Sequence, residues 1–294
     1  MKYLGCLVLL LLFSACNMLG TSQKETEKPT LVVAIEPLRY FADILADGYF
    51  NVVSLVPQGN SPESYDPTPA QLIALSRCKA YMGIPYIGFE MAWRDRLKQN
   101  APGVPFIDIT EGMELIHSDV HRHFHAESNF QESEHHHAVE PHVWTSPAEA
   151  SVIVENMVQV LTVVDTLHRD VYRHRADSLR HELQQLDSLF ACRLQPGGAF
   201  MVYHPTLSYM ARRYGLQQLC IEEEGREPSP AYLAELIEEG RRKGIKVVFV
   251  QPEFDSRHAG IIAKELGAEV VEINPLAYEW KEQMVKVMEE MLDL

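Results

Sequence analysis

The sequence is poor in cysteine and in positive charge, and it lacks the short motifs of several common enzyme classes. It has five cysteines, none of them in a CxxC pair, which argues against zinc-finger and thioredoxin-like sites. HExxH, GxSxG and P-loop patterns are missing as well. Lys and Arg number 26 against 41 Asp and Glu, and the formal net charge of -15 disfavours nucleic acid or anionic lipid as a partner while it favours attraction of cations.

The first residues have the pattern of a bacterial export signal. Lys2 precedes an apolar run over residues 7–13, which is too short to span a bilayer, and two small residues stand directly before Cys16. This end resembles the lipobox of bacterial lipoproteins, in which the cysteine is acylated. We expect removal of residues 1–15, a lipid anchor on Cys16 at the periplasmic or cell-surface side of a bacterial membrane, and a flexible polar tether over residues 16–30. The alternative is an ordinary secreted protein in which Cys16 has no special role.

The mature chain retains three cysteines. Cys6 is lost with the signal and Cys16 is assigned to lipid, which leaves Cys78, Cys192 and Cys220. At most one disulfide can form within the chain, and the sequence leaves its pair open, with Cys192 and Cys220 as one choice.

Residues 31–294 are expected to form the soluble body, because no second apolar stretch approaches the roughly 20 residues needed to cross a bilayer. Short apolar runs rich in β-branched residues alternate with longer helical patterns, which is typical of parallel sheets buried on both faces. Four runs come early and three come late, at residues 31–35, 51–56, 80–84, 105–109, 199–203, 246–250 and 268–273. The sequence therefore predicts an α/β protein of two lobes, each with a parallel sheet flanked by helices.

A long helical region separates the two sets of strands. Between residues 148 and 192 there is no Pro or Gly, and apolar residues recur at helical spacing. Asp165 is a candidate cap for a second helix within this region. We predict an N-terminal lobe over residues 31–164, a linking backbone helix over residues 165–195 and a C-terminal lobe over residues 196–294, with the functional site in the cleft between the lobes.

Three side chains suited to a metal ion lie near the ends of predicted elements. Open α/β sheets place their ligands at the carboxyl ends of the strands. Glu63 lies in a Pro-rich loop after the second predicted strand, His204 directly follows the strand at 199–203, and His142 lies just before the helical region. Two imidazoles and a carboxylate are a suitable ligand set for zinc, with a fourth position open for water or another side chain. Taken singly, each of the three is also explained as a solvated or hydrogen-bonded polar residue.

Six segments around these residues follow one another in a recognisable order. They are SPESYDPTPAQL (61–72), GFEMAW (88–93), EPHVWTSP (140–147), YHPTLSYMARRYGL (203–216), EGREPSP (224–230) and EINPL (272–276). With them the chain resembles, over essentially its whole mature length, the zinc and manganese solute-binding proteins of bacterial ABC transporters, the ZnuA/TroA-like receptors. The resemblance implies a receptor outside the cytoplasmic membrane that binds a divalent transition metal and delivers it to a membrane permease. We expect a monomer that performs no catalytic step.

The resemblance also assigns roles to particular residues. His142 and His204 fall at the family's second and third ligand positions, whereas Glu63 stands where the family normally has a histidine as its first ligand. A fourth ligand, an aspartate in many manganese receptors, falls near Asn274, whose uncharged amide oxygen is a poorer ligand. Two carboxylates without a family match are alternative fourth ligands, namely Glu227 and Glu253.

This set of donors leaves the metal open among three ions. Zn(II) leads on general frequency, but two histidines and a carboxylate also suit Fe(II), and added carboxylate shifts the preference toward harder ions such as Mn(II). Because an imidazole must be deprotonated to bind a metal, the affinity should fall as the pH drops toward the usual histidine pKa of about 6.5. We therefore expect metal release to be linked to proton uptake.

A histidine-rich loop over residues 117–137 precedes His142. Acidic residues are mixed with its histidines, a composition that binds metal but cannot form a core. The auxiliary ligands that we expect there are His121, His123, His125, His135, His136 and His137. The loop is similar to the histidine-rich loop of zinc-specific family members. We expect it to bind metal weakly and to raise the metal concentration near the main site, with a solvated linker as the alternative.

Two other classes of function fit part of the sequence. A site of two histidines and a glutamate could hold zinc for hydrolysis or iron for oxygen chemistry, although the sequence offers no obvious general base. A surface adhesin or a metal-buffering lipoprotein would need no transporter at all.

Overall fold

The computed structural model describes residues 28–117, 139–223 and 225–292. Three predictions therefore lie outside the described residues: the export signal, the acylation site Cys16 and most of the tether. The same holds for the auxiliary histidines His121, His123, His125, His135, His136 and His137.

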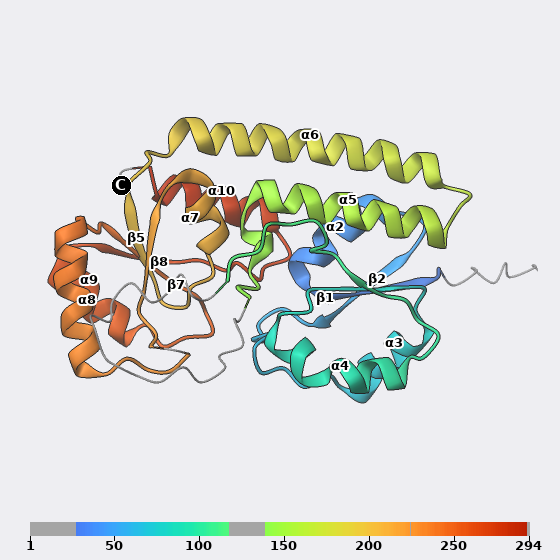
Figure 1. Ribbon diagram of the computed structural model, residues 1–294, viewed down its shortest axis with the longest axis horizontal. Helices are drawn as coiled ribbons and strands as arrows, with labels where there is room; N and C mark the ends of the chain where they lie inside the picture. The colour runs from blue at the N-terminus through green and yellow to red at the C-terminus, as the bar shows by residue number, and fades with distance from the viewer. Residues whose placement is uncertain (1–27, 118–138, 224, 293–294) are drawn as a thin grey trace, which may run out of the picture.

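Each half of the described chain contains a four-stranded parallel sheet flanked by helices (Figure 1). We call the halves the N lobe and the C lobe. The N-lobe sheet has the order β2-β1-β3-β4, with β1 (Thr30–Ile35), β2 (Asn51–Val56), β3 (Tyr81–Gly83) and β4 (Phe106–Asp108). The C-lobe sheet has the order β6-β5-β7-β8, with β5 (Ala199–Val202), β6 (Gln217–Cys220), β7 (Val247–Val250) and β8 (Glu269–Glu272). The expected α/β fold with two lobes is confirmed.

Among the described residues, seven helices directly follow a strand, and two of them begin at a capping side chain. Their bounds are α2 (Glu36–Ala46), α3 (Pro69–Arg77), α4 (Gly88–Asn100), α7 (Ser208–Tyr214), α8 (Pro230–Lys243), α9 (Arg257–Leu266) and α10 (Trp280–Glu290). Thr68 caps α3 in a capping box with Gln71, and Pro69 occupies the first helical position. Ser229 caps α8 by accepting a hydrogen bond from the N–H of Tyr232 at 3.2 Å. The loop that ends at Thr68 carries Glu63, which lines the cleft between the lobes.

Strand β6 was not predicted, although the other seven strands were. Its sequence is QQLC, and at the edge of the sheet Gln217 is exposed while Gln218 is half-buried. An edge strand of this kind has no continuous apolar run, so the pattern that revealed the other strands is missing. Because β6 was not predicted, Glu222, which follows its carboxyl end, was not recognised as a residue of the site.

The long helical region is two helices, α5 (Pro147–Val164) and α6 (Arg169–Arg193). The predicted break near Asp165 is confirmed, but its expected role as a cap of the second helix is wrong. Asp165 is the C-cap residue of α5, and His168 is the N-cap residue of α6. The Asp165 carboxylate instead stabilises the turn by accepting hydrogen bonds from the N–H of Leu167 at 3.1 Å and the hydroxyl of Tyr172 at 2.6 Å.

Helix α6 has 25 residues and is about 37 Å long, and it runs beside both lobes (Figure 1). By length and composition alone, α5 is the one described helix that could cross a membrane, yet it buries a face against α6 and α2, as a core helix does. Helix α10 contacts the N lobe, where Trp280 packs on Phe41 with ring centroids 5.0 Å apart. One hydrophobic cluster therefore runs through both lobes, which restricts large movements between them.

Candidate metal centre

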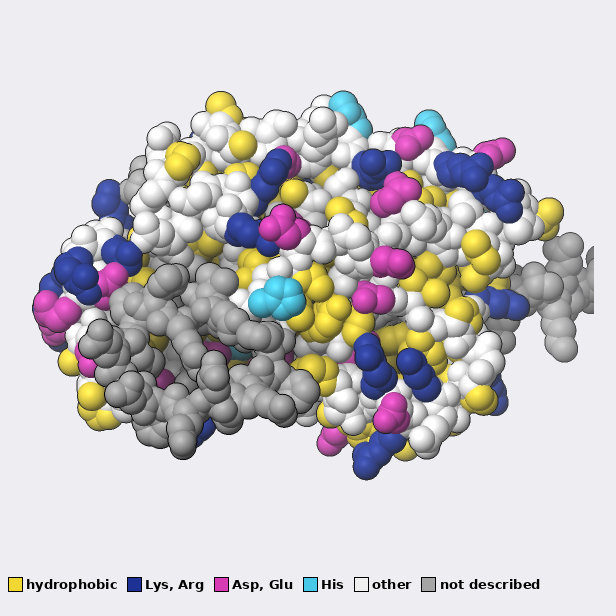
Figure 2. All heavy atoms as spheres, in the orientation of Figure 1, with side chains coloured by type: hydrophobic (Ala, Val, Ile, Leu, Met, Phe, Trp, Pro, Cys, Tyr) yellow, Lys and Arg dark blue, Asp and Glu magenta, His cyan; other side chains and the backbone are white. Residues whose placement is uncertain are grey.

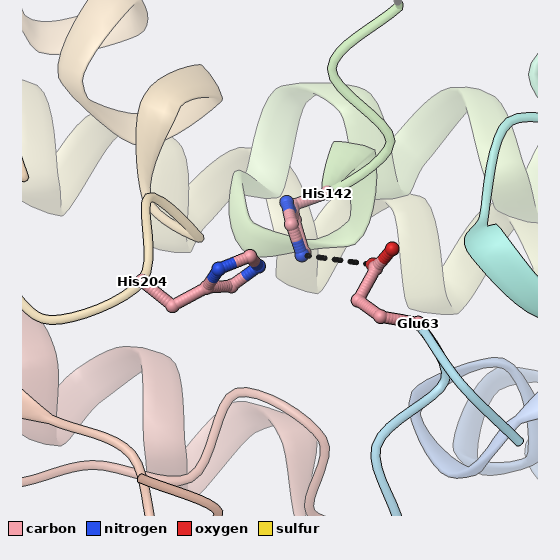
Figure 3. Close-up of side chains that lie close together, drawn as sticks. All are labelled: Glu63, His142 and His204. Carbon is pink, nitrogen blue, oxygen red and sulfur yellow. Dashed lines mark ion pairs between the residues drawn. The ribbon is translucent and has the colours of Figure 1, made fainter. Parts of the chain in front are cut away.

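Glu63, His142 and His204 converge between the two lobes (Figure 3). One ligand atom from each lies within 4.8 Å of the other two, and Nε2 of His142 is 4.0 Å from Oε1 of Glu63. The centroids of the two imidazole rings are 5.1 Å apart, and their planes cross at 79°. Among the described residues, this is the one group of His, Cys, Asp and Glu that meets the spacing of a metal site. The structure thus brings together the three residues that the sequence singled out.

The loop that carries Glu63 rests on the start of α4. A Cβ atom at Gly88 would lie 2.3 Å from the carbonyl oxygen of Glu63, so no larger residue fits there without moving the loop. The N–H of Phe89 donates to the carbonyl of Pro62 at 2.9 Å. Glu90, which is buried in the same helical turn, accepts a hydrogen bond from the N–H of Ile84 at 2.7 Å. The GFE sequence at residues 88–90 therefore acts as a support for Glu63.

His142 is held at the point where the lobes meet. It precedes a short 3-10 helix, η2 (Val143–Thr145), whose three residues are buried. The indole N–H of Trp144 donates to the carbonyl of Pro275 at 2.8 Å, and the indole N–H of Trp280 donates to the carbonyl of Trp144 at 2.6 Å. Both partners of Trp144 belong to the C-terminal part of the chain, so the position of His142 depends on contacts with it.

His204 follows β5 and is tied to the loop after β7. Its N–H donates to Oε1 of Gln251 at 3.3 Å, and the Gln251 amide donates back to the carbonyl of His204 at 2.7 Å. The ring of Phe254 stacks on its imidazole, with centroids 5.3 Å apart and planes at 22°. These contacts hold the ring edge toward the cleft.

Each histidine has a carboxylate on its other ring nitrogen. Nδ1 of His142 is paired with the buried Glu140, and Nδ1 of His204 is 2.8 Å from Oε1 of the nearly buried Glu222. A carboxylate at Nδ1 keeps the proton on that nitrogen and leaves the lone pair on Nε2. Nε2 of His204 is buried and has no hydrogen-bond partner among the described residues. An imidazole oriented in this way is prepared to bind a cation.

The electrostatics of the cleft favour a cation. Burial by itself would lower the pKa of His142, but the nearby carboxylates outweigh it, first Glu140 and then Glu63 and Glu222, so that its pKa is raised. The described lining of the cleft includes no Lys or Arg. A divalent cation would relieve the repulsion among these carboxylates, and it would compete with a proton for His142.

Replacing Glu222 by glutamine tests the role of the carboxylate behind His204. We expect zinc binding to weaken about 10- to 100-fold, because an amide no longer fixes the tautomer of His204 or raises its basicity as a ligand. Competition with a chromophoric chelator measures the dissociation constant. Glu235→Gln, on the exposed face of α8, is the matched control. Equal affinities in the two variants would contradict the proposed role of Glu222.

The other residues considered as ligands are placed differently. Glu253 lines the cleft with the three central residues and is half-buried. Oδ1 of Asn274 accepts the N–H of Leu276 at 3.1 Å, which engages this oxygen in its own turn, and Asn274 is not among the described lining residues. Glu227 is exposed and is likewise not among them.

Four residues that support the site were not predicted from the sequence, namely Gly88, Glu140, Glu222 and Gln251. A carboxylate two residues before a histidine was a readable signal for Glu140, and the SPES and GFE segments together could have suggested a contact with Gly88. Glu222 and Gln251 gave no such signal, because strand β6 was not recognised and because a glutamine after a strand is common. The three cysteines of the mature body, Cys78, Cys192 and Cys220, are free thiols in the structure.

The separations within the trio are close to those of a filled site. Four donors at about 2.1 Å around zinc are about 3.4 Å from one another, so bringing the three ligand atoms from within 4.8 Å to that spacing needs movements of roughly 1 Å. Rotations of side chains and small shifts of the loops supply movements of this size. The donor set and its spacing therefore fit a divalent transition metal.

Known proteins share both the sequence pattern and the fold. The profile of the family described as zinc-uptake complex component A, periplasmic (ZnuA), matches residues 31–294. The high-affinity zinc uptake system protein ZnuA of Bacillus subtilis (strain 168) is 26% identical over 284 residues, covering 94% of this chain and 88% of that protein. The zinc-binding lipoprotein AdcA of Streptococcus pneumoniae (strain ATCC BAA-255 / R6) is 27% identical over 281 residues, and although 91% of this chain is covered, it spans only 54% of AdcA.

A crystal structure of ZnuA superposes on the chain with a TM-score of 0.81 at 30% sequence identity. The superposition covers 91% of this chain and 99% of the ZnuA chain. Since the family profile covers the entire body of two lobes, the chain belongs to the ZnuA family of zinc-uptake components.

Proposed function

We propose that this protein captures Zn(II) outside the cytoplasmic membrane and delivers it to the permease of an ABC transporter. The observation that carries the proposal is the convergence of Glu63, His142 and His204, in which the buried Nε2 of His204 has no hydrogen-bond partner in the described part of the chain. The names of the relatives, a zinc uptake protein and a zinc-binding lipoprotein, support zinc as the cargo. Zinc is bound and released without a chemical step.

The shared core suggests how binding could be signalled. Glu63 comes from the N lobe and His204 from the C lobe, while His142 lies between them. Because one hydrophobic cluster runs through both lobes, we propose that metal binding orders loops and tilts the lobes slightly, without a wide hinge motion. A permease would then distinguish the loaded from the empty form by these loops.

Uptake in cells tests the function directly. A strain that lacks this protein should accumulate less radioactive zinc and grow poorly when zinc is chelated, and the intact gene should restore both properties. Elemental analysis and anomalous diffraction of protein loaded from an equimolar mixture of Zn(II), Mn(II) and Fe(II) should show zinc at the three residues, as the usual order of metal affinities predicts. Unchanged zinc uptake in the deletion strain would overturn the proposed function, and manganese at the site would overturn its cargo.

We propose Glu253 as the fourth ligand, in place of water. Zinc usually takes four donors, and Glu253 is the remaining carboxylate in the described lining of the cleft. Its loop is already linked to His204 through Gln251 and Phe254. Glu253→Gln should weaken zinc binding at least about tenfold, whereas Asp255→Asn, on the exposed side of the same loop, should not. A crystal structure of the zinc-loaded natural protein should show a carboxylate oxygen of Glu253 at the fourth position, and a water molecule there would overturn this assignment.

We propose that the histidine-rich loop binds additional metal weakly. His117 at the start of this loop and Val139 just after it form an antiparallel bridge. Val139 is three residues before His142. Deleting residues 121–137 should leave one tight zinc site and remove the weak ones, because the three central residues lie outside the deleted segment. Isothermal titration should therefore show a single binding step in the shortened chain. Loss of the tight step as well would contradict this division of roles.

We also propose that the mature chain is a monomer, anchored through acylated Cys16 and tethered by residues 16–30. We keep the predicted division into an N-terminal lobe, a linking helix and a C-terminal lobe as part of this proposal. The lipoprotein among the relatives supports the anchor. Helix α10 falls within residues 196–294 and also packs on α2. The C-terminal lobe would therefore include a helix that contacts the N-terminal lobe. Mass spectrometry of the mature N-terminus tests the anchor, and Cys16→Ser should release the chain from membranes.

A further inference from the structure

The turn between α5 and α6 exposes two large apolar side chains. Val163 is 77% exposed and Leu167 is 88% exposed, whereas the other exposed large apolar residues of the described chain range from 41% to 62%. The two are four residues apart, at the end of α5 and in the turn that follows. With such high exposure and only three residues between them in the chain, these two side chains are available for contact with another apolar phase.

The turn is held firmly in place. The Asp165 carboxylate accepts hydrogen bonds from the N–H of Leu167 and the hydroxyl of Tyr172, and it pairs with the ring of His168 at 2.7 Å. The ring of His168 lies on Tyr49, with centroids 4.0 Å apart. Leu167 is therefore presented to solvent by a turn whose backbone is held by hydrogen bonds and a ring contact.

The same end of the N lobe carries the first described residues of the chain (Figure 1). Tyr49 precedes β2, and the N–H of Asn51 at the start of β2 donates to the carbonyl of Pro29 at 2.9 Å. The apolar turn and the start of β1 are thus linked through a single contact segment, residues 49–51. Lys28 is twelve positions after Cys16, and even a fully extended chain of that length reaches only about 40 Å.

Exposed basic side chains lie at the same end of the N lobe, in a protein that is acidic as a whole. Lys28 and Lys79 are exposed beside the start of β1, where the N–H of Lys79 donates to the carbonyl of Thr30 at 2.7 Å. Arg169 is exposed two residues after Leu167. Figure 2 shows apolar side chains at this end of the molecule with Lys and Arg beside them. Asp170, next to Arg169, and Asp47, two residues before Tyr49, are exposed as well, so this end carries charged groups of both signs. Exposed apolar groups with charged groups around them suit the headgroup region of a phospholipid bilayer.

We propose that this end of the N lobe seats on the bilayer that holds the lipid anchor, with Val163 and Leu167 among the headgroups. The inference rests on the anchor at Cys16 proposed above. Strand β1 has six residues and spans about 20 Å, and its amino end lies at the seated end. The cleft with Glu63 and His204 lies at the carboxyl ends of the strands, so in this pose it stays clear of the membrane surface and open to incoming metal.

A fluorescent label at position 167 tests the seating in the full-length acylated protein. Cys192 is exposed near the opposite end of α6, about 35 Å away, and provides an internal control. One sample carries an environment-sensitive dye on Leu167→Cys in a Cys192→Ser background, and the other carries it on Cys192 of the natural chain. Both are reconstituted in vesicles of phosphatidylethanolamine and phosphatidylglycerol, some of which contain lipids with a quencher at the headgroup.

We expect the dye at position 167 to shift to the blue and to be quenched by these lipids, while the dye at Cys192 remains in water. Adding Val163→Asp should abolish the shift at 167, whereas Ile261→Asp, an exposed apolar residue on α9, should not. If the protein floats with the vesicles but both dyes report water, the seating is wrong and the anchor stands. If the protein fails to float at all, the proposed lipid anchor is wrong, and the proposed contact with the membrane is wrong as well. Zinc affinity, measured in detergent, tests the proposed function separately.

Discussion

Replacing His204 by alanine should weaken zinc binding by about 100- to 1,000-fold. Zinc bound by four protein donors gains on the order of 10 to 16 kcal/mol, so the loss of one donor removes roughly 3 to 4 kcal/mol. The effect should be large here because Nε2 of His204 is already buried and has no partner in the described ranges, while Gln251 and Phe254 hold the residue in place. Competition titration with a chelator of known affinity measures the change.

A matched control separates loss of a ligand from general damage. His181 is an exposed histidine on α6, far from the cleft, and His181→Ala should bind zinc as tightly as the natural protein. Glu63→Gln should fall between the two, since an amide oxygen is a weaker donor that still fits beside Gly88. Circular dichroism should show the same fold in all three. If His204→Ala and Glu63→Gln both keep tight binding, the assigned site is wrong.

Zinc affinity should fall at least about 30-fold between pH 8 and pH 5. A histidine with the usual pKa of about 6.5 is only about 3% neutral at pH 5, and zinc binds the neutral ring. The pKa of His142 is raised by Glu140, Glu63 and Glu222 against the effect of burial, so protons begin to compete at a higher pH than for an ordinary histidine. Chelator competition at each pH gives the profile.

A fall in pH weakens zinc binding, but its effect on His142 stabilises the folded state of the metal-free protein. A raised pKa means that protonated His142 is stabilised in the folded state, and this contribution is present at low pH and is lost as the pH rises through the folded pKa. The rise in melting temperature caused by zinc should therefore shrink from pH 8 to pH 5. Glu140→Gln should move the affinity profile toward lower pH, because it removes the first of the carboxylates that raise the pKa. A flat affinity profile between pH 5 and pH 8 would contradict the account.

Much of the fold could be predicted because its strands are strongly patterned. Buried strands such as LVVAI and KVVFV are apolar on both faces, and the turns between elements carry Pro, Gly or a cap such as Thr68. The edge strand β6 could not be found in this way, since one side of QQLC faces solvent and needs no apolar residue. The break at Asp165 was found, but its role depends on hydrogen bonds to the next helix that no local pattern specifies.

The sequence by itself determined the class of fold, and it singled out Glu63, His142 and His204 as the donors to examine, because parallel strands bring their carboxyl ends together and the surrounding motifs resemble a known family. Only the tertiary structure decided that the three donors lie within 4.8 Å of one another. It alone paired Nδ1 of His142 with Glu140 and Nδ1 of His204 with Glu222, and it left Nε2 of His204 without a partner in the part of the chain that is described. The physical reason is that ligand geometry depends on how two lobes pack through a common core, and residues more than 60 positions apart carry no local signal of their distance in space.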